Sequence, residues 1–185
     1  PSLCKKLKAV LSENGQNELM YEIEMPLSKV LASMENIGFL VDREGIEVFG
    51  EKMSRKADEL TELIYSEAGV EFNINSPKQL GTVLFETLGI PSKKKTKSGY
   101  STNADVLEEL AGEYPIVAHV LEYRAIAKLK STYCEGLLKV IDRDSRIRST
   151  LNQTETRTGR ISSTEPNLQN IPVRSEIGRE MRRFF

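Results

Sequence analysis

The chain has 185 residues, of which 39% are hydrophobic and 29% charged, and its formal net charge is −1 at pH 7. It has no apolar run of membrane-spanning length and no signal-peptide pattern, so we expect one or two domains in the cytoplasm without a membrane partner. Cys4 and Cys134 belong to no C-x-x-C motif and His119 is the sole histidine, which excludes a disulfide framework and a multi-histidine metal site.

Two amphipathic helices are predicted in the first third of the chain. Over 17–37 apolar residues recur at spacings of three and four, with Pro26 marking a kink or a restart and Gly38 the end. Asp42 is placed to cap a longer helix that runs to about Ala68 and has one narrow apolar stripe. Such a helix packs along a single seam, as one arm of an antiparallel helical pair.

A third helix is predicted to begin in the segment NINSPKQL. Ser76 is placed to cap this helix and Pro77 takes its first position, while Gly89 and Pro91 stop it. The segment that follows, SKKKTKSGYST, is typical of a basic surface loop.

The second half of the chain changes character after Asp142. Before it, Thr102 and Asp105 resemble a capping box for a short helix, and Pro115 starts a long helix to about Ile141. After it, RIRSTLNQTETRTGRIS predicts an extended ribbon, and the closing EIGREMRRFF predicts a short amphipathic helix or the approach to a strand. The predicted fold is therefore mainly α, of the α+β class, with long helices followed by a short ribbon.

No complete active site is visible in the sequence. It contains no G-x-x-x-x-G-K-[ST], no H-E-x-x-H and no G-x-S-x-G. Carboxylates are plentiful, but they lie on solvated helix faces and no pair stands out. We therefore predict no catalytic residue and no metal ligand in this chain.

Basic residues are concentrated in two segments of this nearly neutral chain. Residues 143–185 hold nine arginines and five acids, and residues 92–102 hold four lysines and no acid. Such patches favour a surface for phosphates, although a loop can be basic for solubility alone. On the long helix Arg124, Lys128 and Thr132 form a row at successive turns, which suits phosphates along a groove. A solvated face is the commoner reading of such a row.

The segment TGRISSTEPNLQNIP, residues 158–172, follows neither a helix nor a strand period. Its hydrogen-bond donors are Arg160, Asn167, Gln169 and Asn170. The minor groove of a duplex presents acceptors at every base pair, whatever the sequence. An arginine and several amides held rigid by two prolines would read that row without choosing a base. The alternative is a turn-rich connection whose amides satisfy its own backbone.

The segment TRTGRISSTEPNLQNIPVR closely resembles bacterial family A DNA polymerases, of the DNA polymerase I type, just before their first catalytic aspartate motif. Three further segments resemble the same family in the same order: YEIEMPLSKVLASMENIGFLVD, EFNINSPKQLGTVLFETLGIPSKKKTKSGYST and VLEYRAIAKLKSTYCEGLLKVI. The resemblance covers residues 17–185.

The resemblance implies a domain organisation. Residues 1–41 match the end of the exonuclease-like domain, its connection and the first helix of the polymerase domain. Residues 42–141 match the thumb, whose long antiparallel helices grip the duplex, and residues 142–185 match the start of the palm. The family continues past Phe185 into the strand with its first metal-binding aspartate. We therefore expect a piece that is inactive alone, from a monomeric parent that uses Mg²⁺, primer–template DNA and deoxynucleoside triphosphates.

The resemblance also implies a role for individual residues. Arg160 matches the arginine that reaches the minor groove at the primer end, and Arg174 matches a basic residue near the incoming triphosphate. The residues expected to bind DNA are Asn75, Ser76, Lys94, Lys95, Thr96, Lys97, Ser101, Thr102, Asn103, Arg124, Lys128, Arg160, Asn167, Gln169 and Asn170. Two alternatives remain open: a free-standing DNA-binding module, and a helical interaction protein whose lysine loop binds acidic partners.

Overall fold

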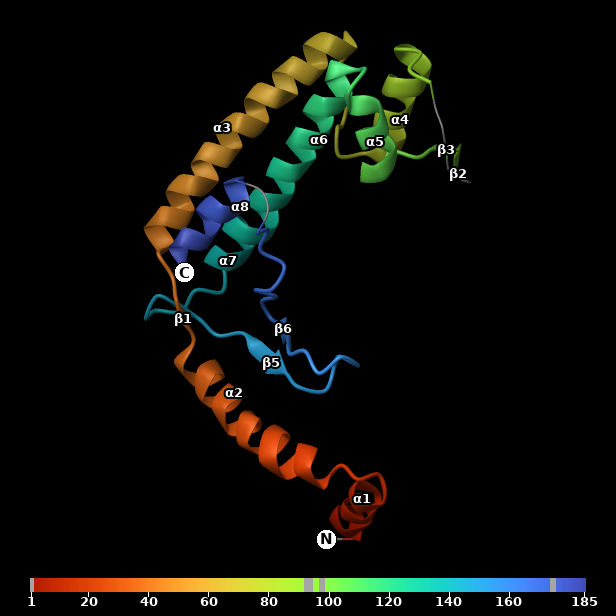
Figure 1. Cartoon of the computed structure of the whole chain (residues 1–185). Coiled ribbons are helices and arrows are strands. Elements are labelled where there is room, and N and C mark those ends of the chain that lie inside the picture. Colours follow the sequence, from red (N-terminus) through yellow and green to blue (C-terminus); the bar gives the residue numbers. More distant parts are fainter. Residues whose placement is uncertain (1, 92–94, 97–98, 174–175) are drawn as a thin grey trace. The chain divides into compact units, whose positions relative to one another are not determined.

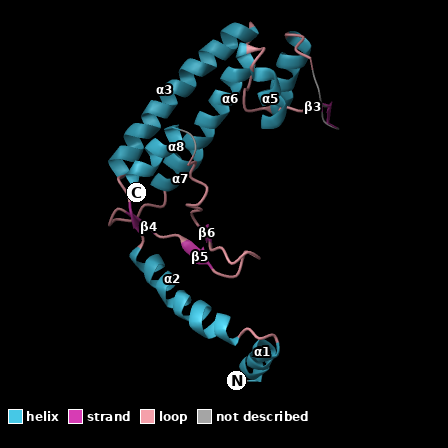
Figure 2. Ribbon diagram, in the orientation of Figure 1, coloured by secondary structure: helices cyan, strands magenta, loops and turns pink. Residues whose placement is uncertain are grey.

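The computed structural model describes residues 2–91, 95–96, 99–173 and 176–185 (Figure 1). The described residues are mainly helical, with short antiparallel strands, which confirms the predicted fold class (Figure 2). The chain divides into two compact units. We call Glu44–Leu138 the helical unit, and Pro1–Arg43 with Lys139–Phe185 the mixed unit.

The helical unit is built around two long helices that run in opposite directions, α3 and α6 (Figure 1). A two-residue ladder pairs β2 with β3 in antiparallel register. The elements are α3 (Arg43–Ala68), α4 (Pro77–Thr82), η2 (Val83–Thr87), β2 (Lys95–Thr96), β3 (Gly99–Tyr100), α5 (Ala104–Ala111), α6 (Pro115–Lys128), η3 (Leu129–Glu135) and α7 (Gly136–Leu138).

The helix starts follow the chemistry of their first residues. α4 begins as predicted: the Ser76 hydroxyl accepts a hydrogen bond from the Gln79 backbone N–H at 3.4 Å, and Pro77 follows. The predicted capping box of α5 is wrong, because Asn103 is the N-cap residue. Thr102 is unsuited to the cap, since it is buried and its hydroxyl accepts from Arg124.

The long helix that begins at Pro115 is continuous but not uniform. Its first part is α6, and from Leu129 to Glu135 it widens into the π-helical segment η3 before ending at Leu138. The prediction placed its end at about Ile141. The wider turns shift the side chains that follow relative to an ideal α-helical face, and π-helical turns are frequent at functional sites.

The core of the helical unit lies among α3, α4, α5 and α6. The predicted apolar stripe of α3 is largely confirmed, since Ile46, Phe49, Met53, Leu60 and Ile64 are buried. The α3 helix also approaches η3 closely: a Cβ on Gly50 would lie 3.3 Å from the Cβ of Cys134. The main hydrophobic cluster comprises Ile64, Ala68, Ile74, Leu80, Val83, Leu84, Phe85, Ile90, Leu107, Leu110, Ile116, Val117 and Val120.

The mixed unit joins short ladders to the helices at its two ends. β1 pairs with β4, aligning Phe39 with Ile147, and β5 pairs with β6, aligning Leu151 with Ser163. The ribbon predicted after Asp142 is thus confirmed, and the end of the chain is helical. Its elements are α1 (Ser2–Glu13), η1 (Leu19–Glu24), α2 (Met25–Ile37), β1 (Phe39–Leu40), β4 (Arg146–Ile147), β5 (Thr150–Asn152), β6 (Ser162–Thr164), α8 (Glu176–Met181) and η4 (Arg182–Phe184).

The carboxyl end of α2 is held by arginines from the β4 region. Gly38 ends the helix with φ of 71°, as its predicted stop position requires. Its carbonyl accepts a hydrogen bond from Arg146 Nη1 at 2.9 Å, and the Asn36 carbonyl accepts from Arg148 Nε at 3.0 Å. The helix predicted over 17–37 is continuous and does not restart at Pro26, since the π-helical η1 passes directly into α2 with helical backbone angles at Glu24 and Met25. These bonds fix α2 against the ribbon.

Candidate nucleic-acid interface

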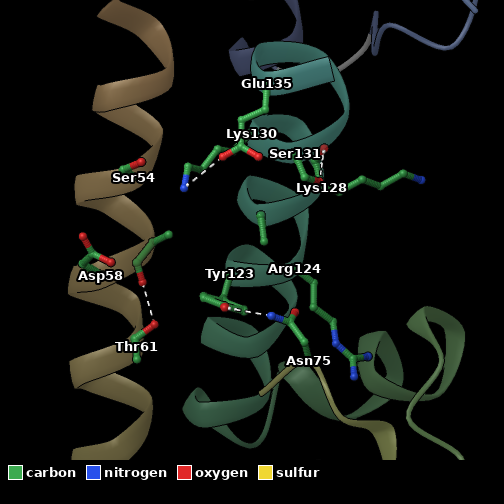
Figure 3. Close-up of a pocket in the computed structure, with 12 residues that line it drawn as sticks. Ser54, Asp58, Thr61, Asn75, Tyr123, Arg124, Lys128, Lys130, Ser131 and Glu135 are labelled. Carbon is green, nitrogen blue, oxygen red and sulfur yellow. Dashed lines mark hydrogen bonds and ion pairs between the residues drawn. The ribbon is translucent and has the colours of Figure 1, made fainter. Parts of the chain in front are cut away.

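A polar pocket of about 570 Å³ opens between α3 and the α6–η3 helix (Figure 3). It brings Asn75, from the turn before α4, together with Arg124 and Lys128. Asn75 was predicted to bind DNA from one segment of the sequence, and Arg124 and Lys128 from another. The polar and charged side chains that line it are Ser54, Asp58, Thr61, Asn75, Tyr123, Arg124, Lys128, Lys130, Ser131 and Glu135.

Asn75 is fixed from both sides. Its side-chain Nδ2 donates to the Tyr123 hydroxyl at 3.1 Å, and its backbone N–H donates to Asn73 Oδ1 at 3.0 Å. The neighbouring Ser76 hydroxyl is engaged as the cap of α4. Tyr123 was not predicted from the sequence, because its role depends on a hydrogen bond with a residue 48 positions away.

Arg124 is half-buried and ties α6 to the turn before α5. Its Nη1 donates to the Thr102 carbonyl and its Nη2 to the Thr102 hydroxyl at 3.4 Å. Burial lowers the pKa of Arg124 from its ordinary value, because removal from water disfavours the charged form. The guanidinium is therefore partly engaged inside the protein.

Lys128 lies one helical turn beyond Arg124 and is exposed. Figure 3 shows both side chains on the side of α6 that faces away from α3, while Lys130 points toward α3. Lys130 forms an ion pair with Glu135 at 3.3 Å, whereas Lys128 has no ion pair among the described residues. Thr132, the third residue of the predicted row, is exposed and lies in the π-helical η3. Lys128 thus offers a charge to an external partner.

The turn before α5 presents polar side chains beside this row. Ser101 donates through its hydroxyl to Asn103 Oδ1, and Asn103 is exposed. Of the predicted lysine loop, the backbone of Lys95 and Thr96 forms β2. Lys94 and Lys97 lie outside the described residues, as does Arg174.

The segment that joins β5 to β6 and continues to Pro172, here called the amide loop (residues 153–172), lies in the mixed unit. Arg160, Asn167, Gln169 and Asn170 are all exposed on it. Gln169 Nε2 donates to the Ile161 carbonyl at 2.6 Å, and Asn167 Oδ1 accepts from the Gln169 backbone N–H at 3.0 Å. Two of the amides therefore satisfy their own backbone in part, which was the alternative reading of this segment. Within the described residues, the Arg160 guanidinium and Asn167 Nδ2 make no hydrogen bond.

Two buried serines hold the amide loop in shape. Ser149 donates to the carbonyls of Thr164 at 3.1 Å and Pro166 at 2.7 Å, and the Ser163 hydroxyl accepts from the Leu168 backbone N–H at 2.8 Å. Each serine is 2% exposed. Neither serine was predicted from the sequence, since the sequence of an extended segment does not show which backbone group a serine hydroxyl will contact.

The base of the amide loop is anchored to α2 and the residue before it. Gln153 Nε2 donates to a Glu24 carboxylate oxygen at 2.7 Å, and the Leu151 backbone N–H donates to Glu35 Oε1 at 2.6 Å. These carboxylates were interpreted as solvated. They instead supply hydrogen-bond acceptors to the ribbon.

Metal-binding chemistry is not assembled in the described part of the chain. No group of three or more His, Cys, Asp or Glu side chains lies together there. His119 lies beside Glu67, with Nδ1 and Oε2 2.9 Å apart. Among the described helices, none combines the length and the apolar character needed to cross a bilayer.

Comparison with known proteins gives consistent matches. Residues 43–185 match the model of DNA polymerase family A. The whole chain is 54% identical to DNA polymerase I of Bacillus subtilis and 52% identical to that of Geobacillus stearothermophilus, and in each case it covers 21% of the relative. The chain thus spans about a fifth of the length of these relatives.

A solved structure matches over the whole chain as well. It is the POL domain of Pol1 from M. smegmatis in complex with DNA primer-template and dNTP. The identity is 41%, the TM-score is 0.89, and the match covers 33% of that protein's chain.

Proposed function

The chain belongs to DNA polymerase family A, and we propose that it is the part of a DNA-directed DNA polymerase that holds the primer–template duplex. One observation carries this proposal: the whole chain matches a polymerase structure that contains primer–template DNA and dNTP, at 41% identity. The whole protein would add deoxynucleotides to a primer 3′ end in replication and repair.

The domain assignment follows from the same family. Residues 42–141, with α3 and α6 as the long antiparallel helices, act as the thumb. Residues 1–41 are the end of the exonuclease-like domain with its connector and the first polymerase helix, and residues 142–185 are the start of the palm. The whole protein works in the cytoplasm, as a monomer.

Phosphate contacts come from the helical unit. Lys128 is exposed and has no ion pair among the described residues, Asn75 lines the same pocket, and Asn103 is exposed next to Thr102, which Arg124 contacts. Cations on successive turns suit the regular spacing of phosphates and give sequence-independent binding. The other members of this interface, whether they contact phosphates or hold neighbouring residues in place, are Ser76, Lys94, Lys95, Thr96, Lys97, Ser101, Thr102 and Arg124.

Base-edge contacts come from the amide loop. The Arg160 guanidinium and Asn167 Nδ2 are donors without a partner among the described residues, and minor-groove acceptors recur at every base pair. Gln169 and Asn170 complete this surface. Arg174 lies near the incoming triphosphate in this proposal.

Mg²⁺ is proposed as the cofactor of the whole protein only. The described residues do not provide a cluster of ligands for it. No step assigned to this chain therefore passes through a metal ion.

Duplex binding by the chain tests the proposal directly. Fluorescence anisotropy should show tighter binding to a duplex with a recessed 3′ end than to single-stranded DNA. Lys128→Ala should weaken binding and reduce the salt slope by about 0.9. Lys56→Ala is the matched control, since Lys56 already pairs with Glu122. Equal affinity for single strands, or no duplex binding, contradicts the proposal.

Arg160 tests the minor-groove contact in the whole polymerase. Arg160→Ala should slow nucleotide incorporation by roughly 5- to 150-fold, the equivalent of about 1–3 kcal/mol for a lost charged hydrogen bond, while duplex affinity stays nearly constant. Arg157→Ala, an exposed arginine in the same loop, is the control.

A primer-terminal base that lacks its minor-groove acceptor provides the complementary deletion. It should slow the unsubstituted enzyme similarly and add little to Arg160→Ala, because both changes remove one interaction. Fully additive defects would show that Arg160 acts elsewhere.

A further inference from the structure

One helical turn of α6 holds two separate turns of the helical unit. Tyr123 accepts a hydrogen bond from Asn75, and the adjacent Arg124 donates to Thr102. The two contacts span 48 and 22 residues of chain. The Arg124 contact raises a question about its role, because a guanidinium committed to the protein is less available to a phosphate.

We propose that Arg124 is a positioning residue: it holds the turn Ser101–Asn103 in place for DNA and does not itself bind a phosphate. This inference rests on the proposed function. It differs from the simpler expectation that Arg124 and Lys128 are two equivalent phosphate ligands.

The geometry at Thr102 supports this division of roles. The flat guanidinium donates from Nη1 to the carbonyl and from Nη2 to the hydroxyl of one residue, a fork that an ammonium group does not reproduce. Thr102 is 5% exposed, so turning Arg124 toward a phosphate would leave buried oxygens without a partner. The burial that lowers the pKa of Arg124 also marks it as removed from water.

The turn is held from a second side by α4. A Cβ on Gly81 would lie 3.3 Å from the Tyr100 Cβ and 3.7 Å from the Thr102 Cγ2, so the backbone of α4 is in close contact with this segment. Gly81 and Arg124 therefore hold it between α4 and α6.

The result of this positioning is a defined donor at Asn103. Its Oδ1 accepts from the Ser101 hydroxyl, which leaves the exposed Nδ2 group as the part of the carboxamide that can donate. An amide N–H₂ group suits a phosphate or sugar oxygen. Loss of the Arg124 contact would let the turn move and would weaken this donation without altering Asn103 itself.

A positioning role and a phosphate-binding role can be distinguished by comparing substitutions that keep the positive charge with substitutions that remove it. In the full-length protein, we expect Arg124→Lys and Arg124→Gln to weaken primer–template binding alike, by roughly fivefold, because neither restores the fork. Lys128 is the matched comparison: Lys128→Arg should bind like the unsubstituted protein and Lys128→Gln should not. Near-normal binding by Arg124→Lys would overturn the positioning role.

Thr102→Val leaves Arg124 in place, and the two roles predict different changes in DNA affinity for this variant. A positioning role predicts weaker binding, because one arm of the contact is lost. A phosphate-binding role predicts unchanged or tighter binding, because the guanidinium is released. Thr102→Ser, which keeps the hydroxyl, should restore affinity. Far-UV circular dichroism verifies the fold of each variant, and Thr102→Val decides the matter if the Arg124 variants unfold.

A double-mutant cycle with Asn103→Ala completes the test. If Arg124 acts through the turn, Asn103→Ala should cost less in the Arg124→Gln background than in the unsubstituted protein. Additive losses would overturn the inference while leaving the proposed function intact. Failure of the unsubstituted protein to bind duplex would instead overturn the proposed function, and the inference with it.

Discussion

The helical unit and the amide loop hold their exposed polar groups in different ways. In the helical unit, Asn75 and Thr102 are anchored to α6 by hydrogen bonds that span 48 and 22 residues. In the amide loop, the bonds from Gln169 to Ile161 and from Leu168 to Ser163 span 8 and 5 residues. One surface depends on helix packing, and the other is shaped mainly by its own turns.

The difference matters because the two surfaces have different proposed tasks. The phosphate contact of a charged side chain such as Lys128 tolerates small shifts, since a charge acts over several ångströms. A base-edge contact needs a donor in hydrogen-bond geometry, which weakens steeply with misalignment. A loop that is braced internally meets this stricter demand. We therefore expect different effects from substitutions in the core of the helical unit and from substitutions of the residues that hold the amide loop: the first should lower stability, and the second should slow nucleotide incorporation.

Leu107→Ala should have the largest effect and should act on the helical unit. Leu107 is 0% exposed in the main hydrophobic cluster, so we expect a loss of about 2–5 kcal/mol in the free energy of unfolding. Urea unfolding measures this loss. Glu108→Ala, at an exposed position of the same helix, should change the free energy by less than about 0.5 kcal/mol.

Thiol labelling shows where Leu107→Ala acts. Burial, assisted by Glu135, raises the pKa of Cys134 to about 11, so this thiol reacts only when the helical unit opens. Cys4 is exposed in the mixed unit and serves as the internal reference. Faster labelling of Cys134 at a constant rate for Cys4 is expected. Unchanged labelling of Cys134 would show that Leu107→Ala does not open the part of the helical unit that holds this thiol.

Ser149→Ala should have the next largest effect and should act on the amide loop. It removes the donor to the Thr164 and Pro166 carbonyls, at a cost of about 1–3 kcal/mol for buried groups left without a partner. Incorporation by the whole polymerase should slow, while duplex affinity changes little. The exposed Thr154→Ala is the control. A loss confined to duplex affinity would show that the loop is a phosphate surface.

Tyr123→Phe should have a smaller effect on duplex binding. The change removes the acceptor for Asn75 Nδ2, a hydrogen bond of about 0.5–1.5 kcal/mol. Binding should weaken by the corresponding factor, and Asn75→Ala should add little to it. Tyr114→Phe is the control, since its hydroxyl makes no hydrogen bond within the described residues. Equal losses from both phenylalanine variants would rule out a specific role for the Tyr123 hydroxyl.

Asp144→Asn should have the smallest effect, on the pH dependence of stability. The hydrogen bond from Arg148, 2.6 Å at Nη2, lowers the pKa of Asp144 in the folded chain. A carboxylate with a lowered pKa stabilises the fold above its unfolded pKa, and this contribution is lost as pH falls through the folded value. Thermal unfolding of Asp144→Asn should therefore be less sensitive to acid than that of the unsubstituted chain.

The control for Asp144 is Glu155→Gln, at an exposed carboxylate without an ion pair in the described part of the chain. It should leave the acid sensitivity unchanged. The effect of Asp144→Asn should be small, because exposed ion pairs contribute little. An identical pH profile for Asp144→Asn and the unsubstituted chain would show that the pair does not persist in solution.

Local chemistry was sufficient to predict several elements. The cap at Ser76, the stop at Gly38 and the helix start at Pro115 were read correctly, because each depends on the conformational preference of one or two residues. The end of the long helix was less well predicted. No simple residue pattern signals the π-helical turns of η3.

The candidate site was predicted in composition but not in arrangement. Lys128 and Arg160 were identified by their charge and context, and both are exposed. Ser149, Glu24 and Glu35 were missed, since their role depends on hydrogen-bond partners that lie 15 to 129 residues away in the sequence. A residue's type states which hydrogen bonds it can make, and only packing selects the partner.

Periodicity and turn chemistry were enough to establish a mainly helical chain with a basic, amide-rich surface, because these signals act within a few residues. The tertiary structure decided what Arg124 does. On the helix it is one of two cations at successive turns, and sequence treats it as the equal of Lys128. Packing of the turn before α5 buries Thr102 against Arg124. The buried Thr102 carbonyl needs a hydrogen-bond donor, and the Arg124 guanidinium supplies it instead of remaining in water.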